Sequence, residues 1–201
     1  MFYEPSKGHG LPHDPFKAIV SPRPIGWIST VSRSGAVNLA PYSFFNAFST
    51  HPFLVWFSSE GEKDSATFAQ ETGEFVVNIV GRDLAKRMNM SSVNAPRGAS
   101  EFDYAGLASA PSRVVAPPRV ADAPAALECK VTDILRPKDL RGDDAGVIVV
   151  TGEVIGVHIA EAFLTDGLFD VVKAGNVSRL GYRDFASITE TFSMTRPRWD
   201  D

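Results

Sequence analysis

The sequence predicts one mainly β domain whose strands curl into a barrel. At least six segments have the residue pattern of strands, few have that of helices, and the first three strand segments leave no room for helices between them. A doubly wound parallel sheet needs a helix between most strands, so that class is excluded. The chain has 201 residues and no Gly/Ser-rich linker, so we take residues 1–201 as a single domain.

Three strand segments come first, over residues 25–33, 36–48 and 53–59. Ser34-Gly35 between the first two is typical of a hairpin turn, so we expect the three strands to form an antiparallel meander. Pro41 lies inside the second segment. A proline there breaks the hydrogen-bond ladder and leaves neighbouring backbone groups free to serve a ligand.

Helical patterns are few and short. We expect a helix over residues 65–72, with Asp64 as its N-cap and Gly73 at its C-terminal end. Residues 82–90 have the apolar spacing of a second helix. A single helical turn is expected near residues 101–107.

Further strands are expected over residues 74–80, 127–135 and 146–159. Gly152 and Gly156 interrupt the last of these. Glycine inside a strand weakens the regular ladder and is common at bulges, so both positions predict bends in a strongly curved sheet.

Two regions have weaker patterns. Prolines crowd residues 92–126, which predicts an ordered loop excursion without long strands. Residues 162–201 contain a turn signal over 166–170 and an extended tail over 195–199, which we expect to wrap a partner subunit. The single cysteine, Cys129, lies in an alternating stretch and is expected to be buried and inert.

The composition disfavours several functions. Lys plus Arg total 20 and Asp plus Glu total 24, a formal net charge of −4, with no long run of either sign. Binding to nucleic acid requires a basic surface, so no nucleic-acid partner is expected. No apolar run reaches the roughly 18 residues of a membrane-spanning helix. The first residues also lack a signal-peptide pattern, so we expect a cytoplasmic, membrane-free protein.

The signatures of several enzyme classes are absent from the sequence. Dinucleotide-binding and phosphate loops, the serine hydrolase elbow and the paired spacings of zinc ligands do not occur. The four histidines are scattered, so no metal site is predicted.

Residues 21–31 contain the first candidate site residues. Arg23 stands between two prolines, which hold its guanidinium in a defined direction and suit a contact with an anion or a carbonyl group. An exposed arginine in a turn is the alternative. Ser29 and Thr30 point to opposite faces of one strand, so one hydroxyl must face inward or into a cleft. An ordinary, satisfied hydroxyl is the alternative there.

The segment from Pro41 to Asn46 combines free backbone amides with aromatic side chains. Amides flanked by Phe44 and Phe45 suit the polar edge and the apolar face of a flavin ring. The alternative is a bulge in an edge strand that packs two core phenylalanines.

A third candidate site lies where a strand ends and a helix begins. Free N–H groups and the helix dipole attract anions at a helix N-terminus, and Lys63 with the Ser58 and Ser65 hydroxyls would complete a monophosphate site. As an N-cap, the Asp64 carboxylate would compete for the same donors. A plain capped helix is the alternative.

In this order the segments resemble the flavin reductase-like, FMN-binding split-barrel family. The motifs are Pro-Arg-Pro-Ile, Trp-Ile-Ser-Thr, Ala-Pro-Tyr-Ser-Phe-Phe-Asn and Lys-Asp-Ser, and the likeness extends over about residues 15–198. The resemblance implies a six-stranded antiparallel split barrel with a few peripheral helices. It also implies a homodimer with FMN at the subunit interface.

The same resemblance implies which residues bind the cofactor. These are Arg23, Ser29, Thr30, Ser43, Phe44, Asn46, Ser58, Lys63, Asp64, Ser65 and Asn89. Asn78 and Arg179 match further recurring positions without an assigned contact, and a strand residue that satisfies a neighbouring backbone is the alternative for Asn78. No catalytic side chain is predicted, because the cofactor carries the redox chemistry.

The function implied is that of an oxidoreductase. NADH or NADPH would reduce FMN, and electrons would pass to free flavin, ferric complexes, oxygen or a partner oxygenase. Two alternatives remain. One is a non-catalytic FMN-binding or flavin-carrier protein, and the other is a flavin-dependent oxygenase that acts directly on a small aromatic substrate.

Overall fold

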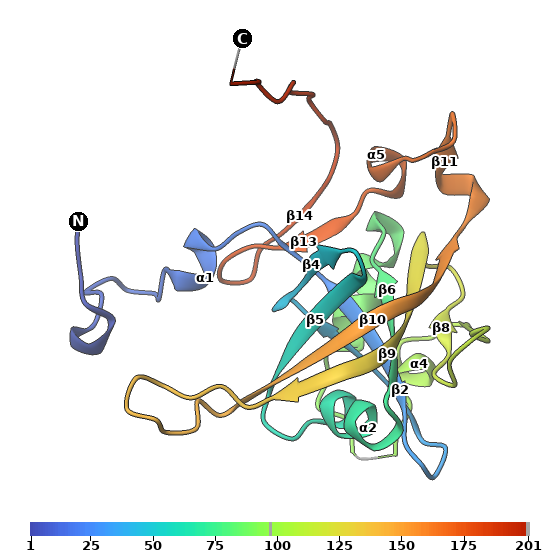
Figure 1. The fold of residues 1–201 in the computed structure, drawn as a ribbon, viewed down its shortest axis with the longest axis horizontal. Helices are drawn as coiled ribbons and strands as arrows, with labels where there is room; N and C mark the ends of the chain where they lie inside the picture. Colours follow the sequence, from blue (N-terminus) through green and yellow to red (C-terminus); the bar gives the residue numbers. More distant parts are fainter. Residues whose placement is uncertain (97, 200–201) are drawn as a thin grey trace.

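The computed structural model describes residues 1–96 and 98–199 of the chain. Its centre is a seven-stranded antiparallel sheet in the order β3-β2-β6-β9-β10-β5-β4, curled into a half-barrel (Figure 1). The strands are β2 (Gly26–Val31), β3 (Val37–Tyr42), β4 (Phe45–Thr50), β5 (Phe53–Glu60), β6 (Glu74–Ile79), β9 (Ala125–Leu135) and β10 (Val147–Ile159). The mainly β split barrel is therefore confirmed, with seven strands in this sheet where six were expected.

Short helices and small strand pairs surround this sheet. The helices are α1 (Phe16–Ile19), α2 (Asp64–Thr72), α3 (Ala85–Met90), α4 (Glu101–Tyr104) and α5 (Val171–Ala174), with 3-10 turns η1 (Pro5–Lys7), η2 (Arg82–Leu84) and η3 (Glu161–Phe163). The smaller sheets are β1 (Arg23–Pro24) with β13 (Val177–Arg179) and β14 (Phe185–Ser187), β7 (Ser109–Ala110) with β8 (Arg119–Val120), and β11 (Leu164–Thr165) with β12 (Leu168–Phe169). None of the helices described is long and apolar enough to cross a membrane.

The expected meander is wrong after its first hairpin. β2 and β3 pair as predicted, but the segment 36–48 is two strands, and β4 pairs with β5 at the opposite edge of the sheet. The chain passes from one edge to the other through Ser43 and Phe44. The Phe44 carbonyl accepts a hydrogen bond from the Ser58 amide at 2.9 Å. Curling of the sheet brings its two edges near each other, so two residues are enough for the crossing.

Helix α2 begins one residue earlier than expected. Lys63, with extended backbone, holds the N-cap position, so Asp64 lies in the first turn and its assignment as N-cap is wrong. The Lys63 side chain cannot accept a hydrogen bond, and it makes no capping bond. Gly73 ends the helix in the left-handed conformation at φ 73°, as predicted.

Two bulges bend β10, and they confirm the prediction from its glycines. The register between β10 and β9 shifts next to Gly152 and again between Val154 and Gly156. At Gly152 a Cβ atom would lie 2.5 Å from the Phe75 ring and 3.0 Å from the Lys130 carbonyl oxygen. Only glycine allows the strand to approach the buried Phe75 ring this closely.

Two hydrophobic clusters cover the two faces of the sheet. Trp27 and Ile28 are neighbours in β2, yet they belong to different clusters because successive side chains of a strand point to opposite faces. Cys129 lies in the same cluster as Ile28 and is fully buried, as predicted. Burial raises the pKa of its thiol far above the ordinary range, so the thiol stays protonated.

A buried carboxylate anchors the proline-rich excursion to the sheet. Glu128 in β9 accepts hydrogen bonds from the amides of Arg113, Val114 and Val115 at 2.7–3.1 Å, and from the His158 imidazole. Burial raises the pKa of Glu128, but these hydrogen bonds outweigh it and hold the pKa below its usual value. The middle of the excursion, at residues 113–115, is therefore fixed against β9.

The C-terminal part has more structure than its sequence pattern indicates. The predicted turn over 166–170 is the β11–β12 hairpin, in which Asp166 and Gly167 both have positive φ. Beyond β14 the chain extends away from the body, as does the N-terminal end (Figure 1). Contact of this tail with a partner subunit stays a prediction.

Replacing Gly152 by alanine should destabilise the fold. The new methyl group would overlap the Phe75 ring, which has no room to move in a filled core, and we expect a loss of about 1–3 kcal/mol in the free energy of unfolding. Chemical denaturation measures this value. Glu153→Ala, at the exposed neighbouring position, should change it by less than about 0.5 kcal/mol. Equal stability of the Gly152→Ala and wild-type proteins would contradict the tight contact.

Candidate functional site

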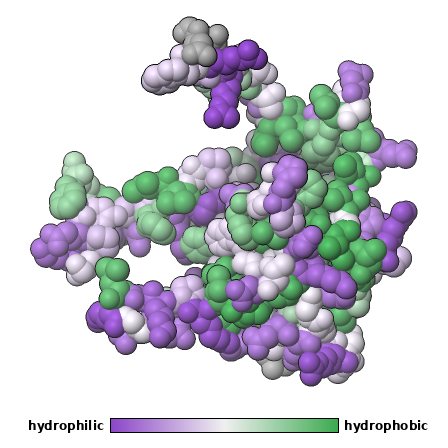
Figure 2. All heavy atoms as spheres, viewed as in Figure 1, coloured by the Kyte–Doolittle hydropathy of each residue, from purple (hydrophilic) through white to green (hydrophobic). Residues whose placement is uncertain are grey.

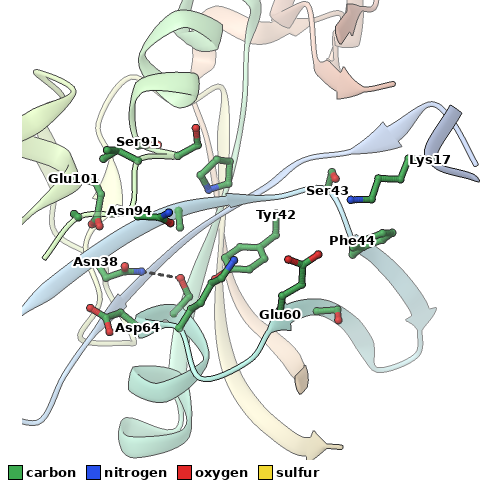
Figure 3. Close-up of a pocket in the computed structure, with 18 residues that line it drawn as sticks. Lys17, Asn38, Tyr42, Ser43, Phe44, Glu60, Asp64, Ser91, Asn94 and Glu101 are labelled. Atoms are coloured by element: carbon green, nitrogen blue, oxygen red, sulfur yellow. Dashed lines mark hydrogen bonds between the residues drawn. The ribbon is translucent and has the colours of Figure 1, made fainter. Parts of the chain in front are cut away.

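A cavity of about 430 Å³ lies along the free edge of β3 (Figure 3). Its size is typical of sites that hold small molecules and cofactors. The wall comes from β3 and the crossing to β4, the end of β5, the start of α2, the segment after α3, and α4. The lining residues are Lys17, Asn38, Ala40, Pro41, Tyr42, Ser43, Phe44, Ser58, Glu60, Lys63, Asp64, Ser65, Ser91, Ser92, Val93, Asn94, Ala95 and Glu101.

The edge of β3 is kept from pairing with another strand. The Leu39 amide donates to Glu101 Oε2 at 2.9 Å, although the two residues are 62 positions apart. Backbone groups alternate between the two sides of a strand, so the next position on this side is Pro41, which has no amide hydrogen. From Leu39 to the end of the strand the outward donors are thus either satisfied or absent, and the gap beside this part of β3 is left for other groups.

One end of the cavity is rich in hydrogen-bond donors. Lys63 and Ser65 lie at the start of α2, where the helix dipole favours negative charge. Ser65 Oγ accepts a hydrogen bond from Asn38 Nδ2 at 2.7 Å, drawn as the dashed line in Figure 3. Asn38 itself approaches Thr30 Oγ1 at 3.5 Å. The strand β3 therefore fixes the position of the Ser65 hydroxyl.

The other end of the cavity is aromatic and flanked by cations. The Phe44 ring centroid lies 5.8 Å from Lys17 Nζ and 5.8 Å from Arg23 Cζ. Both contacts are within the range of cation–π attraction. Figure 3 shows Lys17, Ser43 and Phe44 together, on the side away from Asn38, Asp64 and Glu101.

Acidic side chains also line the cavity. Glu101 is buried, and burial together with the nearby Asp64 charge raises the pKa of its carboxyl, although the bond from Leu39 acts in the opposite direction. Burial likewise raises the pKa of the Tyr42 phenol. A higher pKa keeps Glu101 protonated over more of the acidic range than an exposed glutamate, which reduces its repulsion of an anion there.

The structure brings six of the predicted residues together around this cavity and places five outside its lining. The six are Ser43, Phe44, Ser58, Lys63, Asp64 and Ser65. The five are Arg23, Ser29, Thr30, Asn46 and Asn89.

Arg23 holds backbone segments together. Its Nη1 donates to the carbonyl groups of Lys17 and Val20, and its Nη2 donates to the Leu180 carbonyl at 2.9 Å. Burial lowers the pKa of this guanidinium, and so does the charge of Arg179 on the paired strand. The sequence suggested that Arg23 contacts an anion or a carbonyl group, and in the structure it contacts backbone carbonyl groups of the chain itself.

Ser29 and Thr30 point to opposite faces of β2, as predicted. Ser29 Oγ donates to the Pro118 carbonyl, whereas Thr30 is buried behind Asn38 and Ser65. Thr30 therefore supports the cavity wall without lining it.

Asn46, Asn78 and Asn89 occupy three different surroundings. Asn46 is exposed in β4, and its Oδ1 accepts from the Ala47 amide at 2.9 Å. Asn78 is buried; its Nδ2 donates to the Trp27 carbonyl, and its Oδ1 accepts from the Val120 amide. The alternative, that Asn78 satisfies neighbouring backbone groups, is therefore confirmed. Asn89 lines a second cavity, between α3 and β13–β14.

Sequence reasoning missed several residues of the wall. Asn38 and Glu101 were not among the candidates, and neither were Lys17 and the segment 91–95, whereas Tyr42 belongs to the predicted segment from Pro41 to Asn46. The only signal in the sequence was the motif itself, because Asn38 and Tyr42 stand within or beside its Ala-Pro-Tyr-Ser segment. Glu101 comes from the proline-rich excursion, in a segment that shares the likeness to the family but indicates no contact for this residue.

The sequence model of the family described as flavin reductase like domain matches residues 20–171. A protein of Halalkalibacterium halodurans, named uncharacterized, is 38% identical over 183 residues, which cover 89% of this chain and 87% of that protein.

Two solved structures are similar over nearly the whole chain. The nitrilotriacetate monooxygenase component B of Bacillus cereus has a TM-score of 0.87 at 27% identity and covers 96% of this chain and 98% of its own. The 2-nitrobenzoate 2-nitroreductase of Pseudomonas fluorescens has a TM-score of 0.81 at 28% identity, and the match covers 92% of this chain and 89% of that protein.

Replacing Glu101 by glutamine should stabilise the protein at pH 7. The folded-state pKa of Glu101 lies above the unfolded value of 4.5, so its ionisation opposes folding as the pH rises through that interval. Glutamine keeps an oxygen for the Leu39 amide and removes the charge. We expect an increase of about 1 kcal/mol, seen as a Tm higher by about 2–4 °C at pH 7, and no increase at pH 4. A lower Tm at both pH values would contradict this account.

Proposed function

The chain belongs to the flavin reductase-like family, and from this premise we propose that it is an oxidoreductase that binds one FMN in the cavity beside β3. In this proposal NADH or NADPH is the electron donor. The observation that carries it is the donor-rich end of the cavity, where Lys63, Ser58 and Ser65 meet the first turn of α2.

These side chains match the needs of a phosphate monoester. A phosphate takes several hydrogen bonds and carries about two negative charges, and it is favoured by an ammonium group and a helix N-terminus. Lys63 supplies the charge and the Ser58 and Ser65 hydroxyls supply donors, of which that of Ser65 is positioned by its bond from Asn38. Asp64 on the same turn is an anion as well, so Lys63 must offset it when a phosphate binds.

The opposite end of the cavity suits a planar ring. The Phe44 face and the backbone of Pro41 to Phe44 would hold the ring and keep water from it, while Lys17 and Arg23 make this end electropositive. When bound, FMN supplies the hydride- and electron-accepting chemistry. The protein's own residues then need only to bind, orient and shield, which explains why no acid–base pair or nucleophile is required.

Two similar structures support different electron acceptors. The likeness to a monooxygenase component B supports delivery of reduced flavin to a partner oxygenase. The likeness to a 2-nitroreductase supports direct reduction of a small aromatic compound. Between them we favour delivery to a partner, because the higher TM-score and coverage belong to the first.

We further propose that the protein is a homodimer. Large apolar side chains are exposed on the neighbouring strands β4, β5 and β10, with Phe48 52% and Phe53 59% exposed. Ile155, Val157 and Ile159 continue this apolar surface on β10. Figure 2 shows hydrophobic residues gathered where β10 ends and α5 lies. Exposed apolar surface of this kind is typical of a subunit contact, and it lies at an open sheet edge.

Replacing Lys63 by alanine should weaken FMN binding at least 10-fold. The variant loses a charge-assisted hydrogen bond to the phosphate, worth about 1.5–3 kcal/mol. Quenching of flavin fluorescence on titration measures the Kd. Riboflavin has no phosphate, so its affinity should change less than about two-fold. Lys138→Ala removes an exposed lysine of the β9–β10 loop and should leave both affinities unchanged.

The FMN-loaded protein separates the remaining alternatives. Mixed with NADH or NADPH without oxygen, it should lose the yellow absorbance of oxidised flavin. Retention of that absorbance with both donors would contradict the proposed oxidoreductase activity and favour a non-catalytic flavin carrier.

For the phosphate site, equal FMN affinity of the wild-type and Lys63→Ala proteins would be the contradicting result.

Replacing Phe48 by aspartate should shift the protein toward monomers. A charge buried at an apolar contact is strongly unfavourable, so the dimer dissociation constant should rise by at least 10-fold. Sedimentation velocity over a concentration series measures it. Leu140→Asp changes a fully exposed leucine in the loop between β9 and β10 and should leave the dimer intact. A monomeric wild-type protein would refute the proposal.

A further inference from the structure

A second compartment adjoins the first cavity on the far side of Ser43. It consists of two neighbouring cavities of about 610 and 270 Å³ that share part of their lining, namely Met88 and Asn89 of α3 and Arg179 and Phe185 of β13 and β14. The smaller one is also lined by Pro41, Ser43 and Ser92, which line the first cavity too. A ligand in the second compartment would therefore lie next to whatever occupies the first.

The second compartment is strongly positive. Lys86, Arg179 and Arg183 contribute to its lining, and none of its lining residues is aspartate or glutamate. In the part of the chain that the structure describes, none of these three cations forms a salt bridge. This differs from the first cavity, where Glu60, Asp64 and Glu101 face two lysines.

The Arg179 guanidinium is held in place by its surroundings. It stacks on the Phe185 ring at 4.4 Å, and its Nη2 donates to the Tyr182 carbonyl. Tyr182 has a positive φ of 54°, a conformation that a tyrosine rarely adopts, in the tight turn between β13 and β14. Stacking and one anchored nitrogen fix the plane of the group and leave its other N–H groups for a further acceptor.

A second guanidinium adds to the positive field. β13 pairs with β1 so that Arg179 lies opposite Arg23; burial lowers the pKa of Arg23, and the Arg179 charge lowers it further. The three carbonyl groups around Arg23 accept from its Nη1 and Nη2 without neutralising its charge, and its buried Nε has no hydrogen-bond partner among the residues that the structure describes. An anion beside Arg179 would relieve the repulsion between the two arginines.

We propose that this compartment is the binding subsite for the anionic group of the second reactant, a carboxylate or phosphate attached to a planar ring. Arg179 would bind the anion through its free donors, with Lys86 and Arg183 as further charges. Pro41, Met88 and Ile25 offer an apolar wall for the ring. This inference rests on the proposed function, because the reactive ring would lie at Ser43, beside the ring end of the FMN cavity.

Two kinds of reactant carry this chemistry, and three probes distinguish them. Benzoate represents an aromatic carboxylate acceptor, and NADH and NADPH represent a dinucleotide donor. Benzoate is titrated by calorimetry into the FMN-loaded protein, with benzamide as its uncharged match. NADH and NADPH would reduce the bound FMN, so they are titrated into the FMN-free protein. The FMN affinity of every variant is measured first. If FMN does not bind, the proposed function fails, and titration of the FMN-free protein with benzoate still tests the subsite.

Arg179→Gln should weaken the binding of at least one anionic probe by 10-fold or more, while the affinity for FMN stays within about two-fold. Arg179→Lys keeps the charge and should recover part of the loss. If the Arg179 variants do not fold, Arg183→Gln, in the exposed turn, should weaken the same probe about three-fold. Arg87→Gln, on the same helix as Lys86 but absent from this lining, is the matched control and should change nothing.

The probe whose affinity falls in the variants then identifies the reactant. A loss for benzoate alone supports an aromatic carboxylate, and a loss for NADH and NADPH supports the dinucleotide. Unchanged affinities for all three anions in the Arg179→Gln and Arg183→Gln proteins would overturn the subsite. Equal affinities of the wild-type protein for benzoate and benzamide, with no effect of the variants on NADH or NADPH, would overturn it as well.

Discussion

The site depends on one sheet edge that is prevented from pairing. A strand edge with free donors attracts another strand, and a barrel that closed at β3 would fill the space where the cavity lies. The Glu101 carboxylate accepts a hydrogen bond from the outward amide of Leu39, and Pro41, at the next outward position, has no amide hydrogen. The chain then crosses to the other edge within two residues, so the gap is bounded by β3 on one side and by β5 and α2 on the other.

Two buried glutamates support this arrangement, and their pKa values shift in opposite directions. Glu128 accepts three backbone amides and a histidine, which hold its pKa low and anchor the proline-rich excursion. Glu101 belongs to the same excursion but has one backbone donor from β3 and a nearby Asp64, so its pKa is raised. Glu128 anchors the excursion to the sheet. Glu101 places in the wall of the cavity a carboxyl whose ionisation opposes folding. Groups that oppose folding in this way are common at functional sites.

The proposed chemistry divides between two compartments of different charge. The first has mixed charge, with a hydroxyl-rich end set by β3 and α2 and an aromatic end flanked by Lys17 and Arg23. In the second every charged lining residue is a cation, and it meets the first at Ser43. A cofactor that carries its own redox chemistry needs binding and shielding more than catalytic side chains. The protein's contribution to specificity then lies in the second compartment, where a reactant would approach the ring.

Local sequence determined the features that depend on a few neighbouring residues. The hairpin at Ser34-Gly35, the helix end at Gly73 and the bulges of β10 follow from backbone freedom and turn geometry, and all were predictable. The motif also named six residues that line the cavity. Tertiary structure alone decided that β3 and β4 lie at opposite edges, that Glu101 reaches Leu39, and that Arg23 and Arg179 lie side by side. These contacts join residues far apart in the chain, and a sequence pattern contains no record of which distant segments the curl of the sheet brings together.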